Sequence, residues 1–223
     1  MARRFRDRRA AGEALAGAVA PAVAAAREAG GPGRVVVLAL PRGGVPVAAP
    51  VADALDAPLG VVVVRKIGVP GHAELAMGAV ALVGTEPHTF RNVDVLGRIG
   101  VPEAVFTAAE RAGTEEARAR VARWGAGDVD PAGALAAVVD DGLATGSTMM
   151  AAVRAVRARG PARVLVAVPA GSRRALDLLA SVAEEVVCPL VPERFAAVGQ
   201  CYADFTQTDD AEVAALLAAR TRG

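Results

Sequence analysis

The sequence predicts an α/β fold, in which a mainly parallel, twisted sheet carries helices on both faces. Short runs rich in valine and leucine alternate with helical segments along most of the 223 residues, and this alternation is typical of parallel strands joined by helical crossovers. The runs are largely apolar throughout, as expected for strands that are buried on both faces. Charged or glycine-rich turns follow three of them, and ligands bind such sheets beyond the carboxyl ends of the strands.

The first part of the chain predicts two helices and three strands. A glycine-rich breaker (GGPG) ends the first helix. In order, the expected elements are a helix within 1–32, a strand at 34–40 (RVVVLAL), a turn at 41–44 (PRGG), a helix to about Asp56, a strand at 59–64, a loop (IGVPGHAE) and a strand at 75–83.

The segment 84–133 interrupts this pattern. It starts with a short polar piece that resembles a hairpin (GTEPHTFRN) and ends in a charged helix at 102–124. The Glu and Arg residues of that helix fall largely at helical spacings, which indicates a solvated face. We therefore expect a helical insertion here.

The α/β alternation then resumes, and the chain shows no internal repeat or low-complexity linker. The expected elements are a strand at 135–139, a helix at 147–159, a strand at 163–168, a helix at 172–180, a strand at 185–190, and a tail with a loop and a short amphipathic helix. We therefore expect a single domain over 1–223, with its core sheet in 33–83 and 134–192, the insertion at 84–133 and a small hood or tail at 193–223.

The composition excludes several classes of partner. The formal net charge is +1 and only 3% of residues are aromatic, so the chain lacks the charge and the stacking platforms of a nucleic-acid-binding protein. No apolar run approaches the roughly 18 residues of a membrane span, and the N-terminal alanine-rich stretch is interrupted by acids and a proline, which favours a helix over a signal peptide. Cys188 and Cys201 have no metal-ligand spacing and fit buried thiols of a cytoplasmic protein.

The most informative stretch is AVVDDGLATGST, residues 137–148. It predicts a buried strand that ends in two carboxylates, Asp140 and Asp141, and a turn that leads into a helix. The acids can accept hydrogen bonds from a sugar diol or coordinate a metal beside it, while the backbone N–H groups of the turn and the helix dipole favour a phosphate. The combination suits a ribose 5-phosphate. The alternative is an acid pair that only caps the next helix.

Lys66 is the only lysine among 25 basic residues. A coding bias toward arginine would replace dispensable lysines, and an ammonium group is not interchangeable with a guanidinium group. Lys66 is therefore a candidate functional residue, with chance as the alternative.

The stretch VVDDGLATGST is similar to the signature of the type I phosphoribosyltransferases, and the resemblance extends over most of the chain through FRDRRAAG, LALPRGGVPVA, VVRKIGVPGHAELAMGAVA and VPERFAAVG. It implies the fold of that family and a Mg²⁺-dependent transfer of phosphoribosyl from phosphoribosyl pyrophosphate (PRPP) to a nitrogenous base, purine-like or other, with release of pyrophosphate. It also implies a homodimer.

The resemblance implies a role for each part of the motif. Asp140 and Asp141 would hold the ribose hydroxyls, directly or through Mg²⁺, and would stabilise positive charge at C1. The 5′-phosphate would be bound by Gly142, Ala144, Thr145, Gly146, Ser147 and Thr148.

Two further segments would contact the leaving group. The resemblance identifies Pro41, Arg42, Gly43 and Gly44 as a pyrophosphate loop, in which an often cis peptide turns N–H groups toward the leaving group and Arg42 supplies charge. Arg65 and Lys66 would contact the pyrophosphate or the base side. The loop 68–77 could act as a lid that excludes water, and its His72 is otherwise an ordinary exposed histidine.

The C-terminal segment is similar to the base-binding hood of the 6-oxopurine enzymes. Phe195, Val198 and Tyr202 would then lie at the base, and Asp204 would hold a second Mg²⁺ on pyrophosphate; otherwise the aromatic residues pack the tail onto the core.

Two departures leave the acceptor base open. The 6-oxopurine enzymes carry an acid where this chain has Ala144, and a lysine at the end of the next strand, where this chain has VAVPAGS. A second hypothesis is a PRPP- or nucleotide-sensing module with little turnover. An unrelated phosphohydrolase ranks last, because no obvious nucleophile is present.

Overall fold

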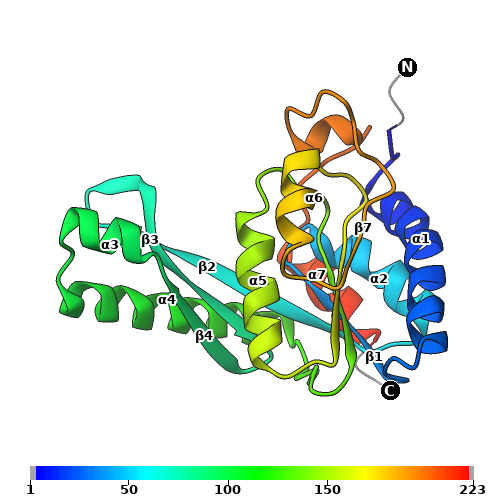
Figure 1. Cartoon of the computed structure of the whole chain (residues 1–223), viewed down its shortest axis with the longest axis horizontal. Coiled ribbons are helices and arrows are strands. Elements are labelled where there is room, and N and C mark those ends of the chain that lie inside the picture. Colours follow the sequence, from blue (N-terminus) through cyan, green and yellow to red (C-terminus); the bar gives the residue numbers. More distant parts are fainter. Residues whose placement is uncertain (1–3, 221–223) are drawn as a thin grey trace.

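The computed structural model describes residues 4–220, apart from the side chains of Ala73 and Glu74. Its centre is a seven-stranded sheet with the order β4-β3-β2-β1-β5-β6-β7 (Figure 1). Strands β2, β1, β5, β6 and β7 run parallel, whereas β3 and β4 are antiparallel additions at one edge. The strands are β1 Val35–Ala39, β2 Leu59–Val69, β3 His72–Val83, β4 Glu86–Arg91, β5 Leu135–Val139, β6 Arg163–Ala167 and β7 Glu185–Val187. The predicted α/β class with a mainly parallel sheet is confirmed.

Helices cover both faces of this sheet (Figure 1). Helices α1, α2 and α7 pack on one face, and α5 and α6 pack on the other. Among the described residues, no helix combines the length and the apolar character needed to cross a membrane. The helices are α1 Arg8–Glu28, α2 Gly44–Leu55, α3 Val93–Ile99, α4 Glu103–Trp124, α5 Ser147–Ala158, α6 Arg173–Leu179 and α7 Asp210–Ala218, with a 3₁₀ turn η1 at Val198–Cys201.

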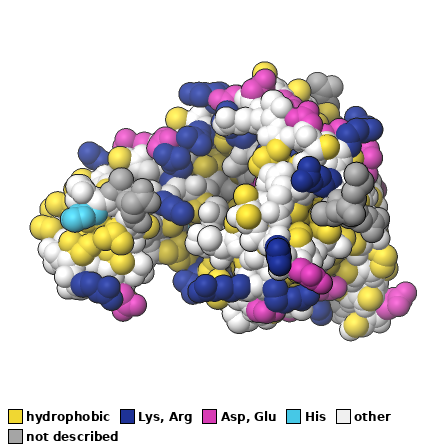
Figure 2. Space-filling view, turned by 90° about the horizontal axis from the view of Figure 1, so that it is seen from above, with side chains coloured by type: hydrophobic (Ala, Val, Ile, Leu, Met, Phe, Trp, Pro, Cys, Tyr) yellow, Lys and Arg dark blue, Asp and Glu magenta, His cyan; other side chains and the backbone are white. Residues whose placement is uncertain are grey.

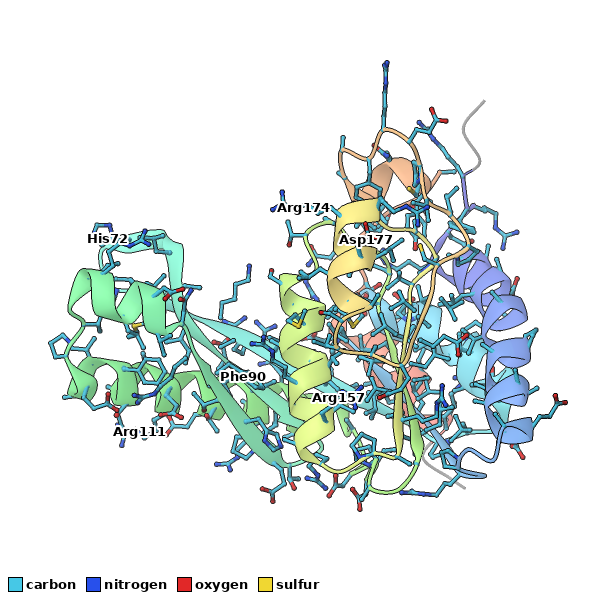
Figure 3. All side chains as sticks on the ribbon, in the orientation of Figure 1. His72, Phe90, Arg111, Arg157, Arg174 and Asp177 are labelled. Carbon is cyan, nitrogen blue, oxygen red and sulfur yellow. The ribbon has the colours of Figure 1, made fainter. Side chains whose placement is uncertain are left out.

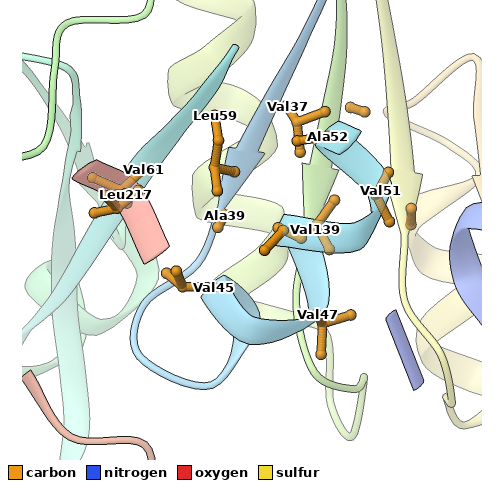
Figure 4. Packing of buried hydrophobic residues seen from close by; sticks show 14 of the residues in the cluster. Val37, Ala39, Val45, Val47, Val51, Ala52, Leu59, Val61, Val139 and Leu217 are labelled. Atoms are coloured by element: carbon orange, nitrogen blue, oxygen red, sulfur yellow. The ribbon is translucent and has the colours of Figure 1, made fainter. Parts of the chain in front are cut away.

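The apolar strands are explained by this double cover. In β1, Val35, Val37 and Ala39 belong to the cluster under α1 and α2, while Val36 and Leu38 belong to the cluster under α5 and α6. Because side chains alternate between the two faces of a strand, both sets must be apolar when both faces are covered. Figure 4 shows the first cluster, where valines of α2 pack on β1 and β5.

The sequence predicts a loop after Val64, but the structure has a β-hairpin there. Strand β2 continues to Val69, the chain turns at 70–71, and β3 returns antiparallel from His72. Ile67 and Val69 are buried in a cluster with Phe106 of α4, so their period-two spacing marks a strand with one covered face. The expected loop 68–77 is therefore the tip of a hairpin.

The insertion also differs in two respects from what we expected. It contains an additional helix, α3, whose first turn is capped by the Asn92 side chain, which accepts a hydrogen bond from the Val95 amide. Its strand β4 extends the sheet beyond β3. Residues 65–124 thus project from the rest of the molecule (Figure 1). We call these residues the arm and the remaining described residues the body.

We expect Phe106→Ala to destabilise the arm more than the body. The ring is 1% exposed at the centre of the arm's own apolar cluster, and removal of a buried Phe side chain costs about 3–5 kcal/mol. Hydrogen exchange measured by mass spectrometry should show that, relative to the wild type, the variant exchanges faster in β3 and β4, with a smaller change in β1 and β5.

Val93→Ala is the matched control, because Val93 lies on the arm and is 72% exposed. Its exchange pattern should match the wild type. An equal loss of protection in the arm and the body of Phe106→Ala would contradict the separation of the two clusters.

Candidate active site

The PRGG turn and the acid pair meet at the carboxyl ends of β1 and β5, which are neighbouring parallel strands. A Cβ atom on Gly43 would lie 2.0 Å from Oδ2 of Asp141, and one on Gly44 would lie 2.9 Å from the carbonyl oxygen of Val139. Any side chain at these two positions would therefore push the turn away from the acids. The Pro41–Arg42 peptide bond is cis, in agreement with the family resemblance.

The two acids lie in a place that disfavours negative charge. Burial, together with the adjacent Asp141, raises the pKa of Asp140 well above its usual range. Burial also raises the pKa of Asp141, against the opposing effect of a nearby guanidinium group. The Asp141 amide donates to Oδ1 of Asp140 at 2.8 Å. Two adjacent buried carboxylates favour a ligand that offsets their negative charge, either a cation or hydroxyl groups that donate hydrogen bonds to them.

The guanidinium group belongs to Arg8, a residue that sequence analysis did not single out. Its Nε donates to Oδ2 of Asp141 at 2.8 Å, and the two side chains are only 11% and 16% exposed. Asp7 caps α1 by accepting from the Ala10 amide. Nothing local in the sequence indicates a contact across 133 residues.

The predicted phosphate loop is preorganised. Gly146 has φ +81° and precedes the first residue of α5, and no side chain of the described residues caps this helix. Its first N–H groups are therefore left for an anion. Ala144, Thr145, Ser147 and Thr148 are exposed, and the Ser172 hydroxyl donates to the Ala144 carbonyl at 2.7 Å.

Residues of the predicted hood contact the backbone of Asp141 and Gly142. Tyr202 is 3% exposed, and its hydroxyl donates to the Asp141 carbonyl at 2.5 Å. Val198 fills the space beside Gly142, where a Cβ atom would lie 2.4 Å from its Cγ1. Phe195 packs with both in one apolar cluster. These placements agree with the alternative in which the tail packs onto the core.

Arg42 lies beside the last helix. Its Nη1 is 3.9 Å from Oδ1 of Asp210, the first residue of α7. The Asp210 carboxylate also accepts from Trp124 Nε1 and from Arg123 Nη1, each at 3.0 Å. One carboxylate therefore joins the PRGG turn to the end of α4.

Arg65 and Lys66 lie on opposite faces of β2. Arg65 donates to Glu116 of α4 at 2.6 Å. Lys66 is exposed and pairs across the hairpin with Ala79, so both side chains share the other face. Ala79 and Ser147 of the phosphate loop line one cavity of about 390 Å³ between the arm and α5. Lys66 thus lies on the phosphate-loop side of the arm, whereas Arg65 does not.

The figures show this arrangement from two directions. Figure 2 shows a hollow between the arm and the body, with Lys and Arg side chains along it. In Figure 3, Phe90 of β4 lies on the side of the arm nearest α5, while His72 lies at the far tip of the arm. His72 is exposed.

The acid pair fits a magnesium ion that is shared with a phosphate ligand. Residues 4–220 contain no group of three His, Cys, Asp or Glu side chains that could hold a metal. Asp204 stands apart, with its carboxylate accepting from the amide and hydroxyl of Thr206. Mg²⁺ uses oxygen ligands and is often held by one or two carboxylates, with phosphate oxygens and water completing its shell. Asp140 and Asp141 supply that set.

Comparisons with known proteins found a family model, similar sequences and similar structures. The family model described as the phosphoribosyl transferase domain matches residues 10–205. A Mycobacterium tuberculosis protein, named in two strains as a putative phosphoribosyl transferase, is 46% identical over 185 residues, which are 82% of this chain and 41% of that protein. The chain thus spans less than half the length of this relative. The crystal structure of TT1426 from Thermus thermophilus is 40% identical, with a TM-score of 0.80 over 97% of this chain and 99% of that one.

We expect Gly142→Ala to destabilise the protein by about 1–3 kcal/mol, because the new methyl group overlaps Val198. In the double variant with Val198→Ala the overlap is relieved. Its loss of unfolding free energy, measured by urea titration, should be clearly smaller than the sum of the two single losses.

Gly17→Ala is the control, because no atom beyond its chain neighbours and the nearby backbone of α1 lies within 4 Å of the place that its new methyl group would take. This variant should be as stable as the wild type or slightly more stable. Additive losses in the double variant would contradict the contact between Gly142 and Val198.

Proposed function

The chain belongs to the phosphoribosyl transferase domain family, and from that premise we propose that it transfers phosphoribosyl from PRPP to a nitrogenous base with release of pyrophosphate. The observation that carries the proposal is the junction of β1 and β5, where the PRGG turn lies against the acid pair and the phosphate loop follows directly. These three parts offer a contact for each charged or hydroxylated group of PRPP.

Each part has one task in the proposed reaction. The free N–H groups at the start of α5 bind the 5′-phosphate. Asp140 and Asp141 accept hydrogen bonds from the ribose hydroxyls and offset positive charge as the bond from C1 to the pyrophosphate oxygen breaks. Arg42 and the turn bind the departing pyrophosphate, while the base nitrogen forms its bond to C1. When bound, Mg²⁺ supplies charge that stabilises the leaving group.

The acceptor in this proposal is a nucleobase-like molecule, purine-like or other. Ala144 offers no carboxylate to a purine N7 proton, so the proton of the base leaves to solvent or to another group. We propose a homodimer and a cytoplasmic location on the family resemblance. The competing role is a PRPP or nucleotide sensor, and the PRGG turn with Lys66 favours an enzyme because a sensor of a monophosphate needs no pyrophosphate contacts.

We expect pyrophosphate release from PRPP and Mg²⁺ to depend on one base in a panel of purines and pyrimidines. Asp140→Asn and Asp141→Asn should each lower the rate about 10²–10³-fold, as removal of one preorganised group at a developing charge does. EDTA should abolish release, and added Mg²⁺ should restore it.

Asp177→Asn is the matched control, because Asp177 is an exposed acid on α6 (Figure 3). Its rate should equal that of the wild type. PRPP binding without release with any base would favour the sensor. If calorimetry detects no PRPP binding, the proposal is wrong.

Lys66 gives a direct probe of the site, because the chain has no other lysine. Acetylation followed by mass spectrometry should modify Lys66 and the N-terminal amine, and PRPP with Mg²⁺ should slow the reaction at Lys66 only. Lys66→Gln should raise the KM for PRPP about tenfold, which corresponds to about 1.4 kcal/mol.

Arg111→Gln is the control for that variant, since Arg111 is a cation on α4 whose side chain is 80% exposed (Figure 3). Its KM should not change. Equal labelling of Lys66 with and without PRPP would place the lysine outside the ligand site.

A further inference from the structure

Arg8 connects the acid pair to the C-terminal tail. Besides its bond to Asp141, its Nη1 donates to the Thr206 carbonyl at 2.5 Å. Its Cζ lies 4.0 Å from the centre of the Phe205 ring, within the range of a cation–π contact. A single side chain therefore touches the acid motif and two successive residues of the tail.

The segment before Arg8 is fixed by backbone hydrogen bonds to the same tail. The Phe5 amide donates to the Cys201 carbonyl, and the Ala203 and Asp204 amides donate to the carbonyls of Phe5 and Arg6, each at 2.8 Å. Since Arg8 opens α1 directly after this pairing, its direction is set by the fold. Arg6 and Arg9, by contrast, have side chains 76% and 79% exposed.

These contacts determine how Asp141 is presented. Its Oδ2 lies between Arg8 Nε and the Cα of Gly43, where no Cβ atom could fit. The carboxylate therefore cannot turn without breaking the ion pair. Among the described side chains, none donates a hydrogen bond to the other oxygen, Oδ1, and the Asp141 amide is the further hydrogen-bond partner of the carboxylate.

We propose that Arg8 is a positioning residue of the phosphoribosyl-donor site. It fixes Asp141 through the ion pair at Oδ2, so that Oδ1 serves the donor, and it holds tail residues Phe205 and Thr206 beside the same acid. The inference rests on the proposed function and adds the N-terminal segment to its site.

The test is calorimetric titration of the full chain with PRPP and Mg²⁺. Arg8→Gln is expected to weaken binding about 10–100-fold, because a charge-assisted contact that positions Asp141 is lost. Arg8→Lys keeps a positive charge at Asp141 but lacks the planar fork, so it should recover part of the affinity. Arg9→Gln, a neighbouring exposed arginine, should bind as the wild type does.

Two further readouts separate positioning from general stability. In Arg8→Ala, added guanidinium at low millimolar concentration should restore part of the PRPP affinity. In the background of Asp141→Asn, Arg8→Gln should cause little further loss, because both changes remove the same contact. Hydrogen exchange at 204–208 should rise in Arg8→Gln, while the body strands keep their protection.

The outcomes distinguish this inference from the proposed function. If the wild type binds PRPP and a folded Arg8→Gln variant binds equally well, Arg8 only stabilises the fold and the inference is wrong. Full additivity of Arg8→Gln with Asp141→Asn would also contradict it. If the wild type itself does not bind PRPP, the proposed function and this inference both fail.

Discussion

Two carboxylates placed side by side at the end of a buried strand form the constraint on which this site depends. Burial raises the pKa of both carboxyl groups, and the neighbouring Asp141 raises that of Asp140 further. The fold relieves part of this cost by aiming the Asp141 amide at Asp140 and the Arg8 guanidinium at Asp141. The remaining negative charge is available to a cation or a diol. An arrangement that is unfavourable for the empty protein is thus suited to a charged ligand.

The same acids explain the small residues around them. Gly43 and Gly44 lie so close to Asp141 and Asp140 that a methyl group has no room, and Gly142 lies equally close to Val198. These glycines serve close approach, and Gly43, the residue that precedes α2, has an ordinary helical φ of −61°. Gly146 differs, because its φ of +81° requires a residue without a Cβ atom. Glycine is therefore required for two different physical reasons: close approach at Gly43, Gly44 and Gly142, and a positive φ at Gly146.

The sequence predicted what is local and missed what is distant. The strands β1 and β5 and the loop at 144–148 follow from apolar runs and glycine placement, which act within a few residues. The sequence predicts a loop beyond Val64 where the structure has a hairpin, because the Ile67-Gly68-Val69 alternation is short and contains glycine. Arg8 could not be found, since its partner lies 133 residues away. The predicted roles of Phe195 and Asp204 are untested, because each depends on a ligand.

Asp210 shows how the two parts of the molecule are joined at this site. Trp124 and Arg123, at the end of the arm helix α4, donate to the carboxylate that lies 3.9 Å from Arg42. These two donors lower the pKa of Asp210, so it stays ionised at neutral pH. Among the described residues, Asp210 is the only carboxylate that pairs with Arg42. The arm, which carries Lys66, and the PRGG turn are therefore both joined to Asp210.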